Sequence, residues 1–321
     1  MRTRILLTSI VAAALVGTLG LASGKPKYKL GLIAKSESNP VFQAARVGAQ
    51  DAARELGARL GIEIEILWRT PADEDAQKQA GFIEQLANLG VDGIAITCSD
   101  ATKVTAAIDK AVAGGVAVAC FDSDAPQSKR FVYHGIDDVD CGRAVMAELA
   151  KALGDAEGRI AVLAGNQTAP NLQARVRGVR EELARHPKLK LADVYYHKET
   201  AQDAAAKVQE VQTANPDIVG WAMVGGWPLF SDALMGWKPG EVKIVAVDAL
   251  PSQLKYVEKG IVQVLLAQRV YDWGYRSTEL LIDKIHHDKA PAGQRDISTL
   301  DRVTPENVAE YGRNWEKWLR K

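Results

Sequence analysis

The sequence contains little cysteine, few aromatic residues and no excess of either charge. Of its 321 residues, three are Cys and five are His, and 6% are aromatic. Neither a Cys-x-x-Cys pair nor a His-rich spacing is present, so the pattern does not indicate a zinc site. Lys plus Arg and Asp plus Glu number 40 each. This balance disfavours nucleic acid as a partner, because proteins that bind it carry a basic surface.

The three cysteines leave their own pairing open. They are Cys98, Cys120 and Cys141, so at least one has no partner within the chain. Cys98 and Cys120 each stand at or near the end of a predicted strand. If those strands are neighbours the two thiols could form a disulfide, and small buried thiols fit the same pattern equally well.

A long apolar run stands near the N-terminus. Arg2 and Arg4 precede the apolar stretch 5–21, and small residues follow at positions 22–24. This arrangement predicts a secretory signal peptide over residues 1–24, and therefore an exported protein. An N-terminal membrane anchor is the alternative, because the stretch is long for a signal peptide.

Beyond that segment, strand and helix patterns alternate in two successive sets. The first set predicts strands at 28–34, 62–68, 93–97, 116–121 and 130–134, with helices at 40–60, 76–89 and 101–113. The second predicts strands at 159–163, 190–196, 218–224, 243–247 and 262–267, with helices at 140–153, 171–185, 201–214, 252–259, 271–284 and 307–321. Such alternation indicates an α/β fold of two Rossmann-like lobes with parallel sheets and a cleft between them.

Ligands of parallel α/β sheets bind beyond the carboxyl ends of the strands. Asp122 follows one apolar strand directly, Asp248 follows a similar strand in the second set, and Gln268 ends another. Since right-handed crossovers bring these ends to one edge of a sheet, all three side chains are candidates for a binding site in the cleft.

The trio Asp122-Ser123-Asp124 has three interpretations. An Asp-x-Asp pair holds magnesium in some phosphatases, but the residues that follow do not match that motif. Carboxylates also cap turns, which is the favoured role for Asp124. An ionised carboxylate can instead accept hydrogen bonds from two neighbouring hydroxyl groups of a polyol. We favour this last role for Asp122.

Two helix starts add further candidates. Asn39 precedes a proline at a helix start, where an Asn side chain caps well. Phe42 follows at once, and its ring can cover the apolar side of a sugar. Arg175 lies one turn into a helix of the second set, close enough to reach back toward the cleft.

These segments together resemble a known family. Residues 39–42, 118–122, 175–178, 245–248 and 266–268 are similar to stretches of the ribose-binding-protein-like periplasmic sugar-binding proteins, the type I periplasmic binding proteins that share their core with lactose-type repressors. The resemblance implies two lobes joined by three crossing segments near 135–138, 268–270 and 298–301. The N-terminal lobe would comprise 25–136 plus 269–298, and the C-terminal lobe 137–268 plus 299–321.

The resemblance also implies which residues contact the ligand. The family's positions fall on Asn39, Phe42, Asp122, Arg175, Asp248 and Gln268. The chain departs from the usual pattern at three of the family's other positions, which hold Val41, Ser123 and Gly225. Where the family has an Arg and an Asn, this chain has Ser123 and Gly225, so hydrogen-bond donors are lost and ribose itself is doubtful as the ligand. Lys35 and Trp227 are expected to supply new contacts, and Ser123 is also counted among the ligand-binding residues.

The function expected from the resemblance is that of a periplasmic receptor for a monosaccharide or related polyol. Such a receptor closes on its ligand and delivers it to the membrane permease of an ABC-type importer. It would act as a monomer, without catalytic residue, metal or cofactor. Two alternatives stay open: a sensor that presents the closed lobes to a chemoreceptor or histidine kinase, and a receptor for a non-sugar signalling molecule.

Overall fold

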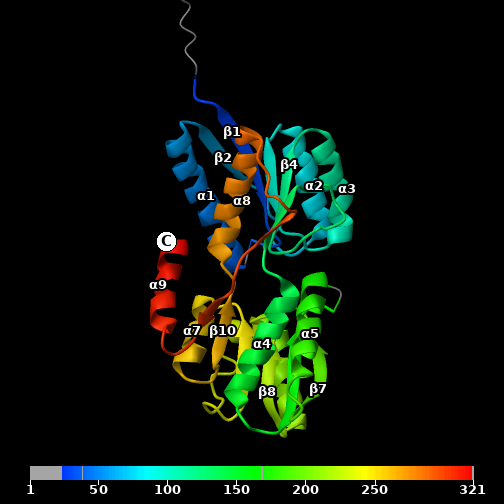
Figure 1. The fold of residues 1–321 in the computed structure, drawn as a ribbon, viewed down its shortest axis with the longest axis vertical. Coiled ribbons are helices and arrows are strands. Elements are labelled where there is room, and N and C mark those ends of the chain that lie inside the picture. The colour runs from blue at the N-terminus through cyan, green and yellow to red at the C-terminus, as the bar shows by residue number, and fades with distance from the viewer. Residues whose placement is uncertain (1–23, 38, 168, 320–321) are drawn as a thin grey trace, which may run out of the picture.

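The computed structural model describes residues 24–37, 39–167 and 169–319. The predicted signal peptide lies outside the described residues except for Gly24. The chain folds into two α/β lobes, one above the other along the long axis (Figure 1). The two lobes with mostly parallel sheets that the sequence predicts are therefore confirmed.

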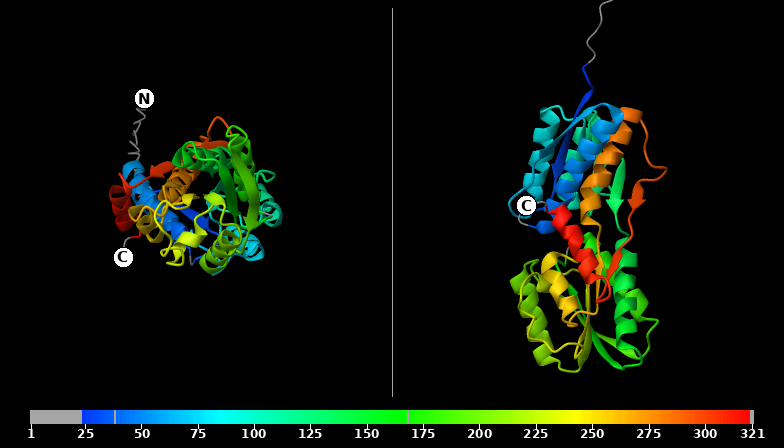
Figure 2. Two further views of the ribbon diagram at one scale, coloured as in Figure 1. Left: turned by 90° about the horizontal axis from the view of Figure 1, so that it is seen from below. Right: turned by 90° about the vertical axis from the view of Figure 1, so that its left-hand side faces the viewer.

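The first lobe contains a parallel six-stranded sheet in the order β11-β5-β4-β3-β1-β2. Helices α1 and α8 pack together on one face, and α2 and α3 pack on the other (Figures 1 and 2). The strands are β1 (Lys27–Ile33), β2 (Glu63–Trp68), β3 (Gly93–Ile96), β4 (Ala117–Phe121), β5 (Val132–Gly135) and β11 (Arg295–Ile297). The helices are α1 (Pro40–Leu60), α2 (Ala76–Asn88), α3 (Ala101–Ala113) and α8 (Val270–His287).

The second lobe repeats this plan with the sheet order β12-β10-β9-β8-β6-β7, in which only the edge strand β12 is antiparallel. Its strands are β6 (Gly158–Ala164), β7 (Leu189–Tyr196), β8 (Ile218–Met223), β9 (Lys243–Val247), β10 (Val264–Ala267) and β12 (Asp301–Val303). Its helices are α4 (Asp138–Leu153), α5 (Pro170–Leu183), α6 (Ala201–Ala214), the 3₁₀ helix η1 (Trp227–Phe230), α7 (Pro251–Glu258) and α9 (Val308–Trp318).

Most predicted elements agree with the structure to within two residues at each end, and α8 and α9 differ by three residues at their C-terminal ends. Three short elements, η1, β11 and β12, were not predicted. β11 reads Arg-Asp-Ile and β12 reads Asp-Arg-Val. A strand of three residues with two charged side chains shows no apolar alternation, so the sequence pattern cannot distinguish it from a loop.

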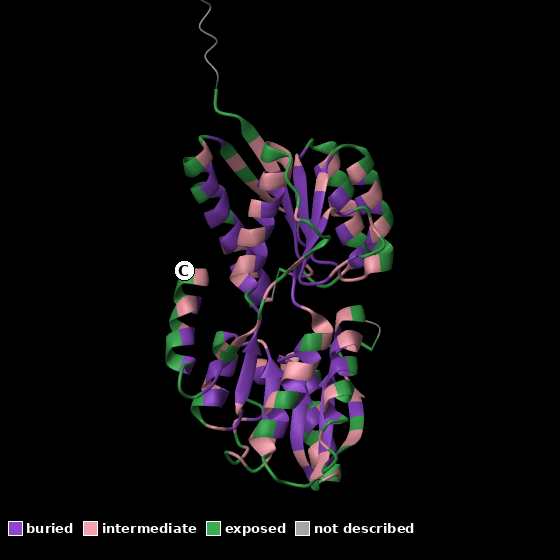
Figure 3. Ribbon diagram, viewed as in Figure 1, coloured by how far each residue is buried: buried purple, intermediate pink, exposed green. Residues whose placement is uncertain are grey.

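The strands in the middle of each sheet are almost wholly buried (Figure 3). All four residues of β3 and all four of β10 are buried. Helices cover both faces of each sheet, so these strands are continuous apolar runs with no alternation. None of the helices in the described part of the chain has the length and apolar character needed to cross a bilayer.

The chain passes between the two sheets three times, after β5, after β10 and after β11. The linking residues are 136–137, 268–269 and 298–300. Because β11 joins the first sheet and β12 joins the second, the last crossing returns the chain to the second lobe. Helix α9 then packs against α7 of the second lobe and α1 of the first.

Candidate functional site

A cavity lies between the lobes at the carboxyl ends of the strands. Its water-accessible volume is about 90 Å³, and residues of both lobes line it. All nine side chains expected from the sequence to contact ligand line this one cavity: Lys35, Asn39, Phe42, Asp122, Ser123, Arg175, Trp227, Asp248 and Gln268.

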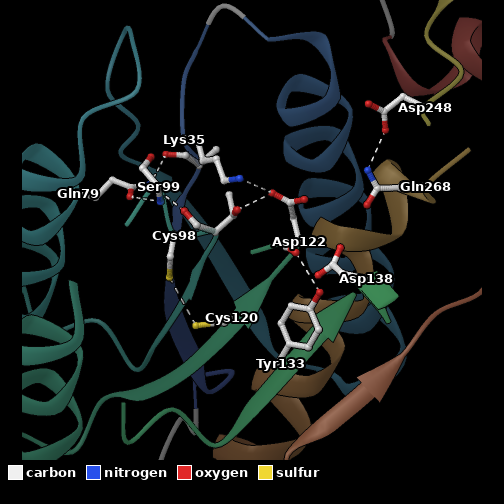
Figure 4. Close-up of polar contacts among 12 residues, drawn as sticks. Lys35, Gln79, Cys98, Ser99, Cys120, Asp122, Tyr133, Asp138, Asp248 and Gln268 are labelled. Carbon is white, nitrogen blue, oxygen red and sulfur yellow. Dashed lines mark hydrogen bonds and ion pairs between the residues drawn. The ribbon is translucent and has the colours of Figure 1, made fainter. Parts of the chain in front are cut away.

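Asp122 stands on the first-lobe wall of the cavity, directly after β4. Its Oδ2 accepts a hydrogen bond from Thr97 Oγ1 at 2.7 Å and lies 3.3 Å from Lys35 Nζ (Figure 4). Burial lowers the pKa of Lys35, but the nearby carboxylates of Asp122, Glu74 and Glu199 together more than offset this, so the net shift of the pKa is upward and the ammonium stays charged. In the described part of the chain, Oδ1 of Asp122 accepts no hydrogen bond, so this atom can serve a ligand.

Asp124 has a different partner. Arg130, which is 4% exposed, donates from Nε to Oδ1 at 2.5 Å and from Nη2 to Oδ2 at 2.6 Å. The two carboxylates of the Asp-Ser-Asp trio are thus engaged by different cations. Among the described residues, no group of three or more His, Cys, Asp or Glu side chains is placed to hold a metal ion. The geometry therefore favours separate roles for Asp122 and Asp124.

The second-lobe wall is formed by a chain of hydrogen bonds. Arg175 donates from Nε to Asp138 Oδ1 at 2.9 Å and from Nη2 to Gln268 Oε1 at 3.2 Å. Gln268 in turn donates from Nε2 to Asp248 Oδ1 at 2.8 Å (Figure 4). The guanidinium thus orients the Gln268 amide, which holds the carboxylate of Asp248.

Asp122 and Asp248 share an uncommon backbone conformation. Their φ angles are 55° and 71°, in the left-handed region that residues with a Cβ seldom adopt. Strained backbone of this kind gathers at binding sites, where the surrounding structure holds it. Burial raises the pKa of Asp248, against the hydrogen bond from Gln268 and the charge of Arg175, which lower it.

A family model described as "Periplasmic binding protein domain" matches residues 30–289. This chain belongs to the periplasmic binding protein family.

Several relatives of known structure or function are similar over most of the chain. The D-allose-binding periplasmic protein of Escherichia coli is 24% identical over 87% of this chain and 94% of its own. A solute-binding protein of an ABC transporter from Burkholderia graminis, solved with D-arabinose, is 27% identical with a TM-score of 0.80, covering 90% of this chain and 98% of its own. An arabinose-binding protein from Geobacillus stearothermophilus is 27% identical with a TM-score of 0.75, covering 89% and 99%.

Phe42 and Asn39 lie together at the start of α1. Phe42 is only 4% exposed, and its ring packs against Trp273 at 6.2 Å between centroids. Asn39 caps α1, accepting a hydrogen bond from Val41 N at 3.2 Å, as the sequence predicts. The cap places Phe42 at the first turn, where its ring reaches both the cavity and the core.

Gly225 explains the position of Trp227. A Cβ at residue 225 would lie 2.1 Å from the indole ring of Trp227, and one at Gly165 would lie 2.9 Å from it. The ring therefore occupies the space that a larger side chain at position 225 would take. Where the family that the sequence resembles has an amide-bearing Asn, this protein has a glycine with the indole of Trp227 beside it.

Cys98 and Ser99 also line the cavity. All three cysteines are free and buried, and the sulfur atoms of Cys98 and Cys120 lie 3.9 Å apart, at the distance of a weak thiol hydrogen bond and not of a disulfide. The structure thus supports the interpretation of small buried thiols.

Several residues of the cavity were not predicted from the sequence. Asp138 does not line the cavity, but it accepts a hydrogen bond from Arg175, which does. It was expected only as part of a crossing segment, although its position after the fifth predicted strand was a usable signal. Phe230 and Trp273 line the cavity near Trp227 and Phe42. Glu74 and Glu199 line it from opposite lobes, and they belong to loops whose sequence carries no marker of a site.

Proposed function

We propose that this protein captures a monosaccharide or a related polyol in the interlobe cavity and delivers it to the membrane permease of an ABC-type importer. The observation that carries the proposal is the pair Asp122 and Asp248. Each lobe presents one carboxylate to the same cavity from a strained turn at the end of a strand. The relatives named for D-allose and D-arabinose binding support a sugar as ligand.

The chemistry of the lining suits a polyol. The carboxylates of Asp122 and Asp248 can accept hydrogen bonds from adjacent hydroxyl groups, while Lys35 and Arg175 can donate to ring or hydroxyl oxygens. The indole of Trp227 and the ring of Phe42 offer apolar faces to the C–H side of a sugar. Such a mixture of charged acceptors, donors and aromatic faces is typical of a site that recognises hydroxyl groups on a ring.

The size of the cavity favours one sugar unit. The cavity is small, with a water-accessible volume of about 90 Å³. That space is comparable with the ring and hydroxyl groups of a single monosaccharide. A disaccharide would require the lobes to stay further apart.

The three crossings suit a hinge between the lobes 25–136 plus 269–298 and 137–268 plus 299–321. A ligand that contacts Asp122 on one lobe and Asp248 on the other is bound more tightly when the lobes are closed, and this difference drives closure. We place the mature protein in the periplasm as a monomer, after removal of residues 1–24, with binding as its only activity. N-terminal sequencing of the exported protein tests the cleavage.

The decisive experiment is titration calorimetry with D-allose, D-arabinose, D-ribose and a disaccharide, with mass spectrometry of any molecule that co-purifies. We expect at least one monosaccharide to bind with micromolar affinity or tighter, and the disaccharide not to bind. The double variant Asp122→Asn/Asp248→Asn should lose binding while circular dichroism shows an intact fold. A co-purified ligand without neighbouring hydroxyl groups would contradict the proposal.

A second candidate ligand is a non-sugar signalling molecule with several hydroxyl groups, which Lys35 favours because it places an ammonium group inside the cavity wall. The same mass spectrometry identifies it. Whether the closed protein serves an importer, a chemoreceptor or a histidine kinase is decided by capture with each purified membrane partner in the presence of ligand.

A further inference from the structure

The turn that carries Asp248 is held by side chains from two other elements. Asp248 has a φ of 71° and follows β9. Its own N–H donates to Leu266 O at 2.9 Å, which ties the residue to β10. That bond leaves the conformation of the following peptide groups to be set by something else, because a left-handed residue with a Cβ relaxes unless its neighbours are fixed.

Gln253 of α7 fixes the backbone on both sides of Asp248. Its Oε1 accepts from Leu250 N at 2.7 Å, and its Nε2 donates to Val247 O at 3.3 Å. The side chain is fully buried. A Cβ at Gly226 would lie 2.0 Å from Nε2 of Gln253, so the loop that leads to η1 packs directly on the amide.

Trp315 of α9 binds a second carbonyl of this turn. Its indole Nε1–H donates to Ala249 O at 2.7 Å. The residue is 4% exposed, so water does not compete for this bond. Polar groups of Val247, Ala249 and Leu250 are therefore each bound by a buried side chain from α7 or α9.

The first lobe holds its aspartate in a comparable way. Tyr133 of β5 donates from its hydroxyl to Asp122 O at 2.9 Å (Figure 4). Burial raises the pKa of Tyr133 well above its ordinary value, so the hydroxyl keeps its proton and remains a donor. A buried aromatic donor thus fixes a carbonyl of the aspartate turn in both lobes, although the donors come from unrelated elements.

We propose that Trp315 and Gln253 are positioning residues for ligand binding, which hold Asp248 in the conformation that presents its carboxylate to the cavity. The inference rests on the proposed function in one respect, namely that Asp248 contacts the ligand. It assigns a role in binding to α9, a helix that contributes no residue to the cavity lining.

The test is Trp315→Phe, which keeps an aromatic ring and removes the indole donor. The matched control is Trp221→Phe. Trp221 is also buried in the second lobe, and its Nε1 donates to Gln212 Oε1 at 2.8 Å on a helix away from Asp248. Both variants lose one buried indole bond, so they should lose similar stability.

Two measurements separate positioning from general destabilisation. Amide hydrogen exchange, measured without ligand, should quicken roughly three- to tenfold at residues 248–250 in Trp315→Phe and not in Trp221→Phe. The affinity for D-allose or D-arabinose, whichever binds the wild-type protein, should fall roughly three- to tenfold in Trp315→Phe only. In an Asp248→Asn background, Trp315→Phe should change the affinity no further.

Unchanged exchange at residues 248–250 in Trp315→Phe would overturn the proposal, and so would an equal loss of affinity in both variants. If neither sugar binds but amide exchange at residues 248–250 quickens in Trp315→Phe only, Trp315 still positions the turn of Asp248, and only the choice of sugar as ligand is wrong. Should Trp315→Phe not fold, Gln253→Glu takes its place, because it keeps the acceptor for Leu250 N and loses the donor to Val247 O.

Discussion

At the scale of single residues, the two pocket aspartates occupy equivalent places but differ in their neighbours. Asp122 lies 3.3 Å from the ammonium of Lys35. Asp248 accepts a hydrogen bond from the neutral amide of Gln268. Arg175 donates to that amide and makes no hydrogen bond to Asp248 itself among the described residues. Its negative charge is therefore less well compensated, which is why burial raises its pKa. Keeping Asp248 ionised therefore costs the folded protein stability.

The first prediction concerns Asp248→Asn. The raised pKa means that the ionised carboxyl destabilises the folded protein at neutral pH, so the neutral amide should raise the melting temperature. The same change should weaken sugar binding about ten- to a hundredfold, since a charged acceptor is lost. Thermal unfolding and calorimetry on the same samples test this. A lower melting temperature for the variant would contradict it.

The pH dependence follows from the same shift. The pKa of Asp248 is higher in the folded than in the unfolded state. The ionised carboxyl therefore lowers the stability of the fold at pH values above the raised pKa, and this loss disappears at pH values below the ordinary pKa near 4. The stability gain of Asp248→Asn should therefore vanish when both proteins are compared at about pH 3.5. Affinity of the wild-type protein should decline on acidification as Asp248 takes up its proton.

The second prediction separates the two acids of the Asp-Ser-Asp trio. Asp124→Ala leaves the buried guanidinium of Arg130 without its partner, so the free energy of unfolding should fall by about 2–3 kcal/mol. Its sugar affinity should change less than about threefold, whereas Asp122→Ala should lose about ten- to a hundredfold. Calorimetry and urea unfolding measure both. Equal losses of affinity in the two variants would restore the interpretation in which Asp122 and Asp124 act together as a metal-binding pair.

At the scale of elements, each lobe uses glycine to bring two helices together. A Cβ at Gly274 of α8 would lie 1.7 Å from the carbonyl oxygen of Ala45 in α1. In the second lobe, a Cβ at Gly178 of α5 would lie 2.0 Å from the carbonyl oxygen of Val139 in α4. The close packing of α4 and α5 places Arg175 within reach of Asp138, so the helix contact also sets the geometry of the cavity wall.

The third prediction is that Gly178→Ala destabilises the protein although Ala favours helices. The added methyl group should push α4 and α5 apart and lower the free energy of unfolding by about 1–3 kcal/mol. Sugar binding should also weaken, because Arg175 on α5 is displaced with the helix. Gly81→Ala in α2 is the control, because no atom outside the neighbouring helix backbone lies within 4 Å of the added Cβ. It should stabilise the protein by about 0.5–1 kcal/mol. Urea unfolding of the two variants checks both signs.

At the scale of the whole molecule, α9 lies beside both lobes (Figure 2). Trp315 bonds to the turn of Asp248 in the second lobe, while the ring of Trp318 stacks on Tyr271 of α8 at 6.1 Å between centroids. Tyr271 is the second residue of α8, the first-lobe helix that directly follows the second crossing. Helix α9 therefore connects the second lobe to the start of α8, close to the crossing segments.

The fourth prediction concerns closure. Small-angle X-ray scattering should show a smaller radius of gyration when the binding sugar is present, because contacts to both Asp122 and Asp248 stabilise closed lobes. The double variant Asp122→Asn/Asp248→Asn should show no such change at the same sugar concentration. An unchanged radius in a wild-type protein that calorimetry shows to be saturated would exclude closure by a hinge.

The sequence by itself determined the order of the elements and the residues at the ends of the strands. Strand and helix periods are local signals, and the rule that parallel strands expose their carboxyl ends at one edge turns them into site positions. In this way the amino-acid pattern alone places Asp122, Asp248 and Gln268 at the cavity. The capping of α1 by Asn39 is equally local and is also predictable.

Only the tertiary structure decided which of these side chains engage one another. The pairing of Lys35 with Asp122, and of Arg175 with Asp138, joins residues 87 and 37 positions apart in the sequence. The bond from Trp315 to the turn of Asp248 depends on the last crossing, which returns the chain to the second lobe. Such contacts follow from the crossovers and from the packing of the lobes, which bring distant segments together. Neither segment carries a helix or strand periodicity that would indicate its partner.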